Sequence, residues 1–130
     1  MATKLLPFRT LVERPALFKL WRSVLAADAA PTALDLACGD GWYSRAFLHE
    51  LGASAVHGVD LSPDMIEAGR GKATPGLTLS VGDCTDAAAM ARLGSFDIVT
   101  AAYLLCYAGS EAELEAMMRG VAAAVKPGGA

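Results

Sequence analysis

The stretch ALDLACGDG, residues 33–41, decides the fold. Its first half, residues 33–37, is a compact apolar run with a single acid, short enough to form a buried strand. A glycine-bearing loop, residues 38–41, follows at once, and apolar positions spaced by four then indicate a helix that Gly52 would end: Tyr43, Phe47 and Leu51. A strand, a glycine loop and a helix in this order predict one βα unit of a parallel sheet.

Outside this unit, strands and helices continue to alternate. Further strands are expected over residues 55–59, ending at Asp60, and over residues 77–81 and 96–102. Helices are expected over residues 17–25, from Pro63 behind an N-cap Ser62, over 87–93 and over 111–125. The alternation predicts an α/β fold, a three-layer, doubly wound and mostly parallel sheet. Residues 77–81 alternate apolar and polar, which favours a place near the sheet edge.

The composition of the chain argues against several classes of function. The chain has 130 residues, 54% hydrophobic and 19% charged, which is typical of one globular domain. A net charge of −3 without a basic run argues against a nucleic-acid binder. No apolar stretch is long enough for a membrane span or a signal peptide, so no membrane partner is expected. Three cysteines without a CxxC pair favour reduced thiols and a cytoplasmic protein with no metal site.

The candidate ligand-binding residues directly follow the predicted strands. Gly39 and Gly41 come after the first strand, where missing side chains let the backbone approach a ligand. Asp60 ends the second strand, 19 positions after Gly41, the spacing at which a carboxylate can accept both hydroxyls of a ribose. Asp83 follows Gly82 after the third strand. Two acids and two glycines at neighbouring strand ends predict a nucleoside site.

These segments resemble the motifs of class I S-adenosylmethionine (SAM)-dependent methyltransferases with a Rossmann-like fold. The similar segments, in order along residues 31–129, are DLACGDG (35–41), VDLSPDM (59–65), GD (82–83), FDIV (96–99) and KPGG (126–129). Residues 36–45 are most similar to small-molecule members, including toxoflavin synthase-type N-methyltransferases. The resemblance therefore implies SAM as cofactor, a small-molecule methyl acceptor and transfer of a methyl group between them.

The resemblance also implies roles for individual residues. Ala37 and Gly39 would approach the methionine part of SAM, and Asp60 would hold the ribose. Leu61 would flank the adenine, and Asp83 would accept from its amino group. The full set implied is Asp35, Ala37, Cys38, Gly39, Gly41, Asp60, Leu61, Met65, Asp83, Cys84 and Ala101.

Three details of this set carry their own expectations. Asp35 is expected to orient the glycine loop by accepting its backbone N–H groups. Ala37 replaces the first glycine of the motif, which is tolerable if its φ is negative. Ala101 is expected under the sulfonium end of SAM. No catalytic base is identified.

An NAD-dependent oxidoreductase remains an alternative, since a glycine loop followed by an acid also fits a dinucleotide site. Asp35 inside its strand, the pair at 82–83 and the segment at 126–129 favour the methyltransferase. Thr100-Ala101-Ala102-Tyr103 is unlike the Asn-Pro-Pro-Tyr segment of enzymes that methylate nucleic-acid bases. Three tyrosines could line an acceptor pocket, although core packing is the favoured interpretation: Tyr43, Tyr103 and Tyr107.

Two parts are expected: an N-terminal helical cap, residues 1–30, and a SAM-binding core, residues 31–130. The resemblance implies further strands after residue 129, so the C-terminal strands are expected to be missing and residues 98–105 to form a long, open, apolar edge. Such an edge favours self-association. The alternative function is accordingly a catalytically incomplete SAM-binding fragment or interaction module that needs a partner to complete the sheet.

Overall fold

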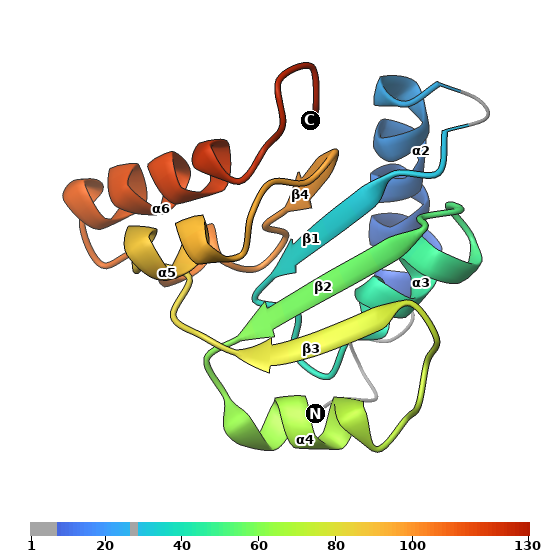
Figure 1. Cartoon of the computed structure of the whole chain (residues 1–130), viewed down its shortest axis with the longest axis horizontal. Helices are drawn as coiled ribbons and strands as arrows, with labels where there is room; N and C mark the ends of the chain where they lie inside the picture. The colour runs from blue at the N-terminus through green and yellow to red at the C-terminus, as the bar shows by residue number, and fades with distance from the viewer. Residues whose placement is uncertain (1–7, 27–28) are drawn as a thin grey trace.

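The computed structural model describes residues 8–26 and 29–130 and is a parallel sheet covered by helices (Figure 1). The strands are β1 (Thr32–Leu36), β2 (Ala55–Asp60), β3 (Leu77–Val81) and β4 (Ile98–Thr100). The helices are the π-helical turn η1 (Arg9–Glu13), α2 (Arg14–Val24), α3 (Trp42–His49), α4 (Pro63–Arg70), α5 (Ala87–Arg92), the 3₁₀ turn η2 (Leu105–Tyr107) and α6 (Glu111–Ala123). The predicted order of strands and helices is confirmed.

All strand pairs are parallel, and the strand order is β3-β2-β1-β4. Crossover helices separate consecutive strands, so the carboxyl ends of the strands share one edge of the sheet. β1 is buried on both faces, as its nearly continuous apolar sequence predicts. β3 lies at one end of the sheet and keeps an exposed Thr78, in agreement with its alternating pattern.

Two hydrophobic clusters lie on the two faces of the sheet. One joins α2 and α3, whose Trp21 and Phe47 rings stack with centroids 4.6 Å apart, to Ala33 of β1. The other joins α5 and α6, through Met90 and Met117, to the opposite face of β1. Figure 1 shows α5 and α6 on one side of the sheet and α2 and α3 on the other. The three predicted layers are therefore present.

The N-terminal helices pack on this core. Pro15 stands in the first turn of α2, directly after the π-helical turn η1. Phe18 and Trp21 of α2 are buried against α3. Residues 1–7 and 27–28 of the expected cap lie outside the described residues, and the boundary between cap and core stays a prediction.

The expected long edge over residues 98–105 is wrong. β4 ends at Thr100, and Leu104 turns inward to become buried in the α5–α6 cluster. Burial of this apolar side chain requires the chain to leave the strand direction. The backbone N–H of Val99 also donates to the carbonyl oxygen of Ala130 at 2.8 Å, which pairs part of the outer edge of β4. Self-association stays a prediction.

The remaining boundaries differ little from those expected. Phe96 lies outside β4 and forms a single parallel bridge with Val125, because α6 ends at Ala123 and the chain then runs beside residue 96. Asp97 pairs with Lys126 at 3.1 Å and accepts from the N–H of Thr32 at 2.8 Å, a structural role. None of the helices in the described part of the chain has both the length and the apolar character needed to cross a bilayer.

Candidate cofactor site

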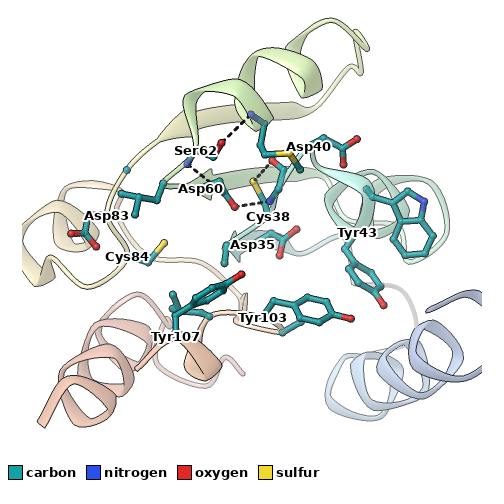
Figure 2. Close-up of a pocket in the computed structure, with 18 of the residues that line it drawn as sticks. Asp35, Cys38, Asp40, Tyr43, Asp60, Ser62, Asp83, Cys84, Tyr103 and Tyr107 are labelled. Carbon is teal, nitrogen blue, oxygen red and sulfur yellow. Dashed lines mark hydrogen bonds between the residues drawn. The ribbon is translucent and has the colours of Figure 1, made fainter. Parts of the chain in front are cut away.

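A cavity of about 540 Å³ opens at the carboxyl ends of the strands (Figure 2). This volume falls within the roughly 300–1,000 Å³ of small-molecule sites. Nine of the eleven residues implied by the family resemblance line it: Asp35, Ala37, Cys38, Gly39, Asp60, Leu61, Met65, Asp83 and Cys84. The sheet topology thus brings together residues from the ends of three strands.

The two other implied residues do not line the cavity. Gly41 is buried behind the loop as the N-cap of α3, with φ 84°, and a Cβ there would meet Arg45, Leu77 and Leu79 side chains. Ala101 packs against the α5–α6 cluster, and the next residue, Ala102, lines the cavity in its place. β4 ends at Thr100, earlier than expected, and the chain then turns. Because of this turn, Ala102 and not Ala101 faces the cavity.

The glycine loop contains two successive sharp turns. Ala37 has φ 57° and Gly39 has φ 58°, both in the left-handed region. The expected negative φ at Ala37 is therefore wrong, and this alanine holds a conformation that glycine adopts more easily. At Gly39 a Cβ would lie 3.2 Å from Met65 Cε, so glycine keeps the loop close to α4. The loop is compact because it reverses direction within a few residues.

Asp60 fixes this loop from β2. Its Oδ2 accepts from the backbone N–H of Gly39 at 2.8 Å, and its Oδ1 accepts from the N–H of Ser62 at 2.9 Å. The half-buried carboxylate lines the cavity and retains further acceptor capacity, since each carboxylate oxygen can accept more than one hydrogen bond. Asp60 is thus able to accept from ligand hydroxyls while holding the loop.

Asp35 acts differently from the expectation. Its carboxylate accepts from the hydroxyl of Ser44 at 2.6 Å and from that of Thr100 at 3.1 Å. The predicted bonds to backbone N–H groups of the glycine loop are wrong, because Asp60 accepts from the loop instead. Burial raises the pKa of Asp35 to about 6, while the two hydroxyls oppose this rise. Asp35 therefore joins β1 to α3 and β4 beneath the cavity.

The wall after β3 holds Asp83 and Cys84. The exposed Asp83 accepts at Oδ1 from the N–H of Thr85 at 2.9 Å and from its hydroxyl at 2.6 Å. These bonds hold its pKa below the usual value. Cys84 is buried, and burial raises the pKa of its thiol, as it does for Cys38. Neither thiol has the lowered pKa of a nucleophile.

Aromatic residues form the opposite wall. The interpretation of the tyrosines as core packing holds for Tyr43, which is buried in the cluster of α2 and α3, and for Tyr103, which packs against that cluster, but it is wrong for the exposed Tyr107. Tyr43, Tyr103 and Tyr107 all line the cavity, together with Trp42. The hydroxyls of Tyr43 and Tyr103 both donate to the carboxylate of Glu13 in η1, and Figure 2 shows both pointing toward the N-terminal helical segment. Burial, with the Glu13 carboxylate adding to it, raises the pKa of both phenols.

Sequence reasoning assigned no site role to several other lining residues. Arg9, Asp40, Ser62, Gly82, Thr85, Ala102, Leu104 and Met117 also line the cavity. Most of them adjoin residues that were implied, so strand-end position alone could have suggested them. Arg9 of η1 and Met117 of α6 are the exceptions, because neither lies at the end of a strand.

A network outside the cavity supports the loop. Arg45 of α3 donates to the carbonyl oxygens of Asp40 and Gly69, both at 2.6 Å. Lys72 pairs with the carboxylate of Asp40 at 2.6 Å. Arg45 therefore connects the glycine loop to the end of α4, which carries Met65 on the cavity side.

The lining is acidic. Among the residues described, four aspartates contribute to it (Asp35, Asp40, Asp60 and Asp83) against a single cation, Arg9. Carboxylates in a partly enclosed cavity favour a cationic ligand and disfavour a polyanionic one. The donor set, the strand-end carboxylate and the cavity size fit a nucleoside that carries positive charge.

Comparison with solved structures gives the same fold. CalS10 of Micromonospora echinaspora, an amino pentose methyltransferase solved with SAM bound, is 25% identical with a TM-score of 0.69 and is matched over 88% of this chain and 46% of its own. DesVI of Streptomyces venezuelae is 32% identical with a TM-score of 0.70 and the same coverage, 88% and 46%. The sugar N-methyltransferase KedS8 of a Streptoalloteichus species is 25% identical with a TM-score of 0.69, over 92% and 45%.

The chain spans about half the length of these solved structures. None of the curated proteins matches it. Residues 33–129, which contain every implied site residue and all four strands except the first residue of β1, match a family described as "Methyltransferase domain". The chain therefore belongs to the methyltransferase domain family.

Proposed function

We propose that this chain binds SAM in the cavity and takes part in methyl transfer to a small-molecule acceptor. The acidic cavity at the strand ends is the observation that carries the proposal. SAM bears a sulfonium and an ammonium against one carboxylate, so its net charge is positive. A dinucleotide would instead bring an anionic pyrophosphate among the four aspartates. The charge of the cavity thus favours the methyltransferase over the oxidoreductase.

The residues divide into three binding regions. Asp60 accepts from the ribose hydroxyls. Leu61, directly after β2, and Met65 of α4 contact the adenine. Asp83, beside Cys84, accepts from the adenine amino group. The loop at Ala37 and Gly39 lies against the methionine part. These roles match the residues that share the cavity wall, and binding data will test each of them.

The acceptor is proposed to approach from the aromatic wall. When bound, SAM supplies a methyl group already activated by its sulfonium, so orientation of the acceptor is the main task left to the protein. Tyr43 and Tyr103 stand on the side of the cavity opposite Asp83 and are held by Glu13 (Figure 2). CalS10 is described as an amino pentose methyltransferase and KedS8 as a sugar N-methyltransferase. These descriptions support a small polar acceptor for this chain as well.

Calorimetric titration with S-adenosylhomocysteine (SAH) and with NAD tests the proposal. SAH has the nucleoside and amino-acid parts of SAM without the reactive methyl group. We expect micromolar binding of SAH and none of NAD. Asp60→Asn should weaken SAH by about 10- to 100-fold, the value of one or two charge-assisted hydrogen bonds. Glu67→Gln, an exposed charge on α4 outside the cavity, is the matched control.

Each other result is also informative. Tight binding of NAD would contradict the proposed methyltransferase function and favour the oxidoreductase. Absence of SAH binding by a chain whose circular dichroism shows the native fold would contradict the proposal. Binding of SAH without methyl transfer to a panel of amino sugars would favour the alternative, a SAM-binding module that requires a partner.

A further inference from the structure

Arg9 is the one cationic side chain that lines the cavity among the residues described. It lies on η1, far in sequence from every motif of the site. The ion pairs found in the described part of the chain do not include it. Because none of these ion pairs engages its guanidinium, Arg9 is available to a ligand in the cavity.

One atom of Arg9 lacks a hydrogen-bond partner among the residues described. Its Nε is buried, and it donates no hydrogen bond to any described residue. Buried N–H groups are nearly always bonded, because loss of water without a replacement acceptor costs free energy. The unpaired Nε therefore needs an acceptor that the described side chains do not supply.

The acid best placed to pair with Arg9 is engaged elsewhere. Glu13 is four residues further along the same helical segment, the usual spacing for a pair. Its two carboxylate oxygens accept from the hydroxyls of Tyr43 and Tyr103. No ion pair between Arg9 and Glu13 is found among the described residues.

Arg9 is also held in position. Its guanidinium carbon lies 5.0 Å from the ring centroid of Tyr103, a distance at which the cation is attracted to the ring face. Tyr103 is in turn fixed by Glu13, one turn after Arg9. Arg9, Glu13 and Tyr103 thus form a small cluster that keeps the guanidinium at the cavity wall without neutralising it.

We propose that Arg9 binds an oxyanion group, a carboxylate or a phosphate, of a ligand in this cavity. The planar guanidinium matches both groups with paired N–H donors. The inference rests on the proposed function and extends it, because two sources of the oxyanion are possible. One is the α-carboxylate of SAM, and the other is an acidic group on the methyl acceptor.

The test uses Arg9→Met, which keeps the apolar stem and removes the charge. Arg22→Met is the matched control: this arginine of α2 also lies over a ring, 6.0 Å from the centroid of Phe18, and does not line the cavity. Calorimetry measures binding of SAH and of 5′-methylthioadenosine, which has the same nucleoside and sulfur but no carboxylate. NMR shifts follow millimolar inorganic phosphate, with and without SAH.

Two results support the proposal and identify the source. If Arg9→Met weakens SAH by about tenfold or more and changes 5′-methylthioadenosine by less than about twofold, the oxyanion is the carboxylate of the cofactor. If SAH is unchanged and the phosphate-induced shifts near Arg9 are lost, the oxyanion belongs to the acceptor. Arg22→Met should leave all these values unchanged.

Two other results overturn it. Equal weakening of SAH and 5′-methylthioadenosine would mean that Arg9 only supports the fold of the cavity wall. No change in SAH, 5′-methylthioadenosine or phosphate would mean that it binds no oxyanion. A wild-type chain that binds neither nucleoside contradicts the proposed function alone, since the phosphate measurement without SAH still decides the role of Arg9.

Discussion

The carboxylate of Asp60, at the end of β2, accepts a hydrogen bond of 2.8 Å from the backbone N–H of Gly39 in the loop after β1. The same side chain lines the cavity, so one carboxylate both shapes the loop and faces the ligand. Removal of Asp60 should therefore reduce stability before any ligand is present. Asp60→Ala leaves two backbone N–H groups, of Gly39 and Ser62, without their acceptor.

We expect Asp60→Ala to lower the free energy of unfolding of the ligand-free protein by about 1–3 kcal/mol. Urea denaturation followed by circular dichroism measures this change. Asp83→Ala is the comparison, since that exposed carboxylate bonds only to the nearby Thr85. Its effect should stay within about 0.5 kcal/mol. Equal effects of the two variants would show that Asp60 does not support the loop.

Much of this fold and site could be predicted because the decisive residues are local. The run before Cys38, the loop glycines and the acids at the strand ends each lie within a few residues of a strand boundary. Parallel topology then brings the strand ends together whatever the intervening sequence. Nine implied residues accordingly share one cavity wall.

The parts that were missed depend on contacts between distant segments. The pairing of Glu13 with Tyr103 spans 90 positions, and no periodicity signals it. Burial of Leu104, which ends β4 early, depends on where α6 packs. The sequence could not show which carboxylate accepts from the N–H of the glycine loop either, because Asp35 and Asp60 both lie close to that loop.

Ala37 is strained in a way that a substitution can relieve. Its φ of 57° costs a non-glycine residue about 1–2 kcal/mol, whereas glycine adopts it freely. Ala37→Gly also makes the unfolded chain more flexible, which offsets about 0.4–1 kcal/mol. We expect the variant to be as stable as the wild type or up to about 1 kcal/mol more stable by urea denaturation.

Ala122→Gly provides the matched control. This exposed residue lies in α6, where glycine costs about 1 kcal/mol relative to alanine. The change from alanine to glycine should therefore lower the free energy of unfolding at position 122 and leave it unchanged or raise it at position 37. Destabilisation of Ala37→Gly as large as that of Ala122→Gly would contradict the left-handed conformation of Ala37.

The close approach of α4 to the glycine loop predicts a steric effect at Gly69. A Cβ at this position would lie 2.6 Å from the carbonyl oxygen of Asp40 and 2.6 Å from Leu79 Cδ1. Since the backbone of the loop cannot easily yield, Gly69→Ala should destabilise by about 1–3 kcal/mol despite the better helix propensity of alanine. It should also weaken SAH, because the displaced loop lines the cavity.

Gly71→Ala separates this contact from helix propensity. Gly71 ends the same helix with φ −63°, and its nearest contact to an added Cβ is an ordinary 3.4 Å. Alanine there should be neutral or stabilising by up to about 1 kcal/mol. Urea denaturation and SAH titration of both variants check the prediction, which fails if Gly69→Ala behaves like Gly71→Ala.

The buried Asp35 predicts a specific dependence of stability on pH. Its pKa is about 6 in the folded chain against 3.8 for an ordinary aspartate. The folded protein therefore holds this proton more tightly than the unfolded chain does. The contribution of Asp35 to stability is greatest below about pH 4, falls as the pH rises toward about 6 and then levels off. The difference in pKa corresponds to a loss of about 3 kcal/mol.

Asp35→Asn removes this titration and keeps one acceptor oxygen, for the hydroxyl of Ser44. The amide NH2 then faces the hydroxyl of Thr100, which can accept from it and donate to the carbonyl oxygen of Leu34 at 3.4 Å instead. Urea denaturation of both proteins between pH 4 and pH 7.5 gives two stability curves, and their difference cancels the titration of all other groups. We expect the wild type to lose stability relative to Asp35→Asn across the interval from pH 4 to about 6, with no further relative change above it. Parallel curves would show that Asp35 titrates alike in the folded and unfolded chains, and that its burial beneath the cavity leaves its proton affinity unchanged.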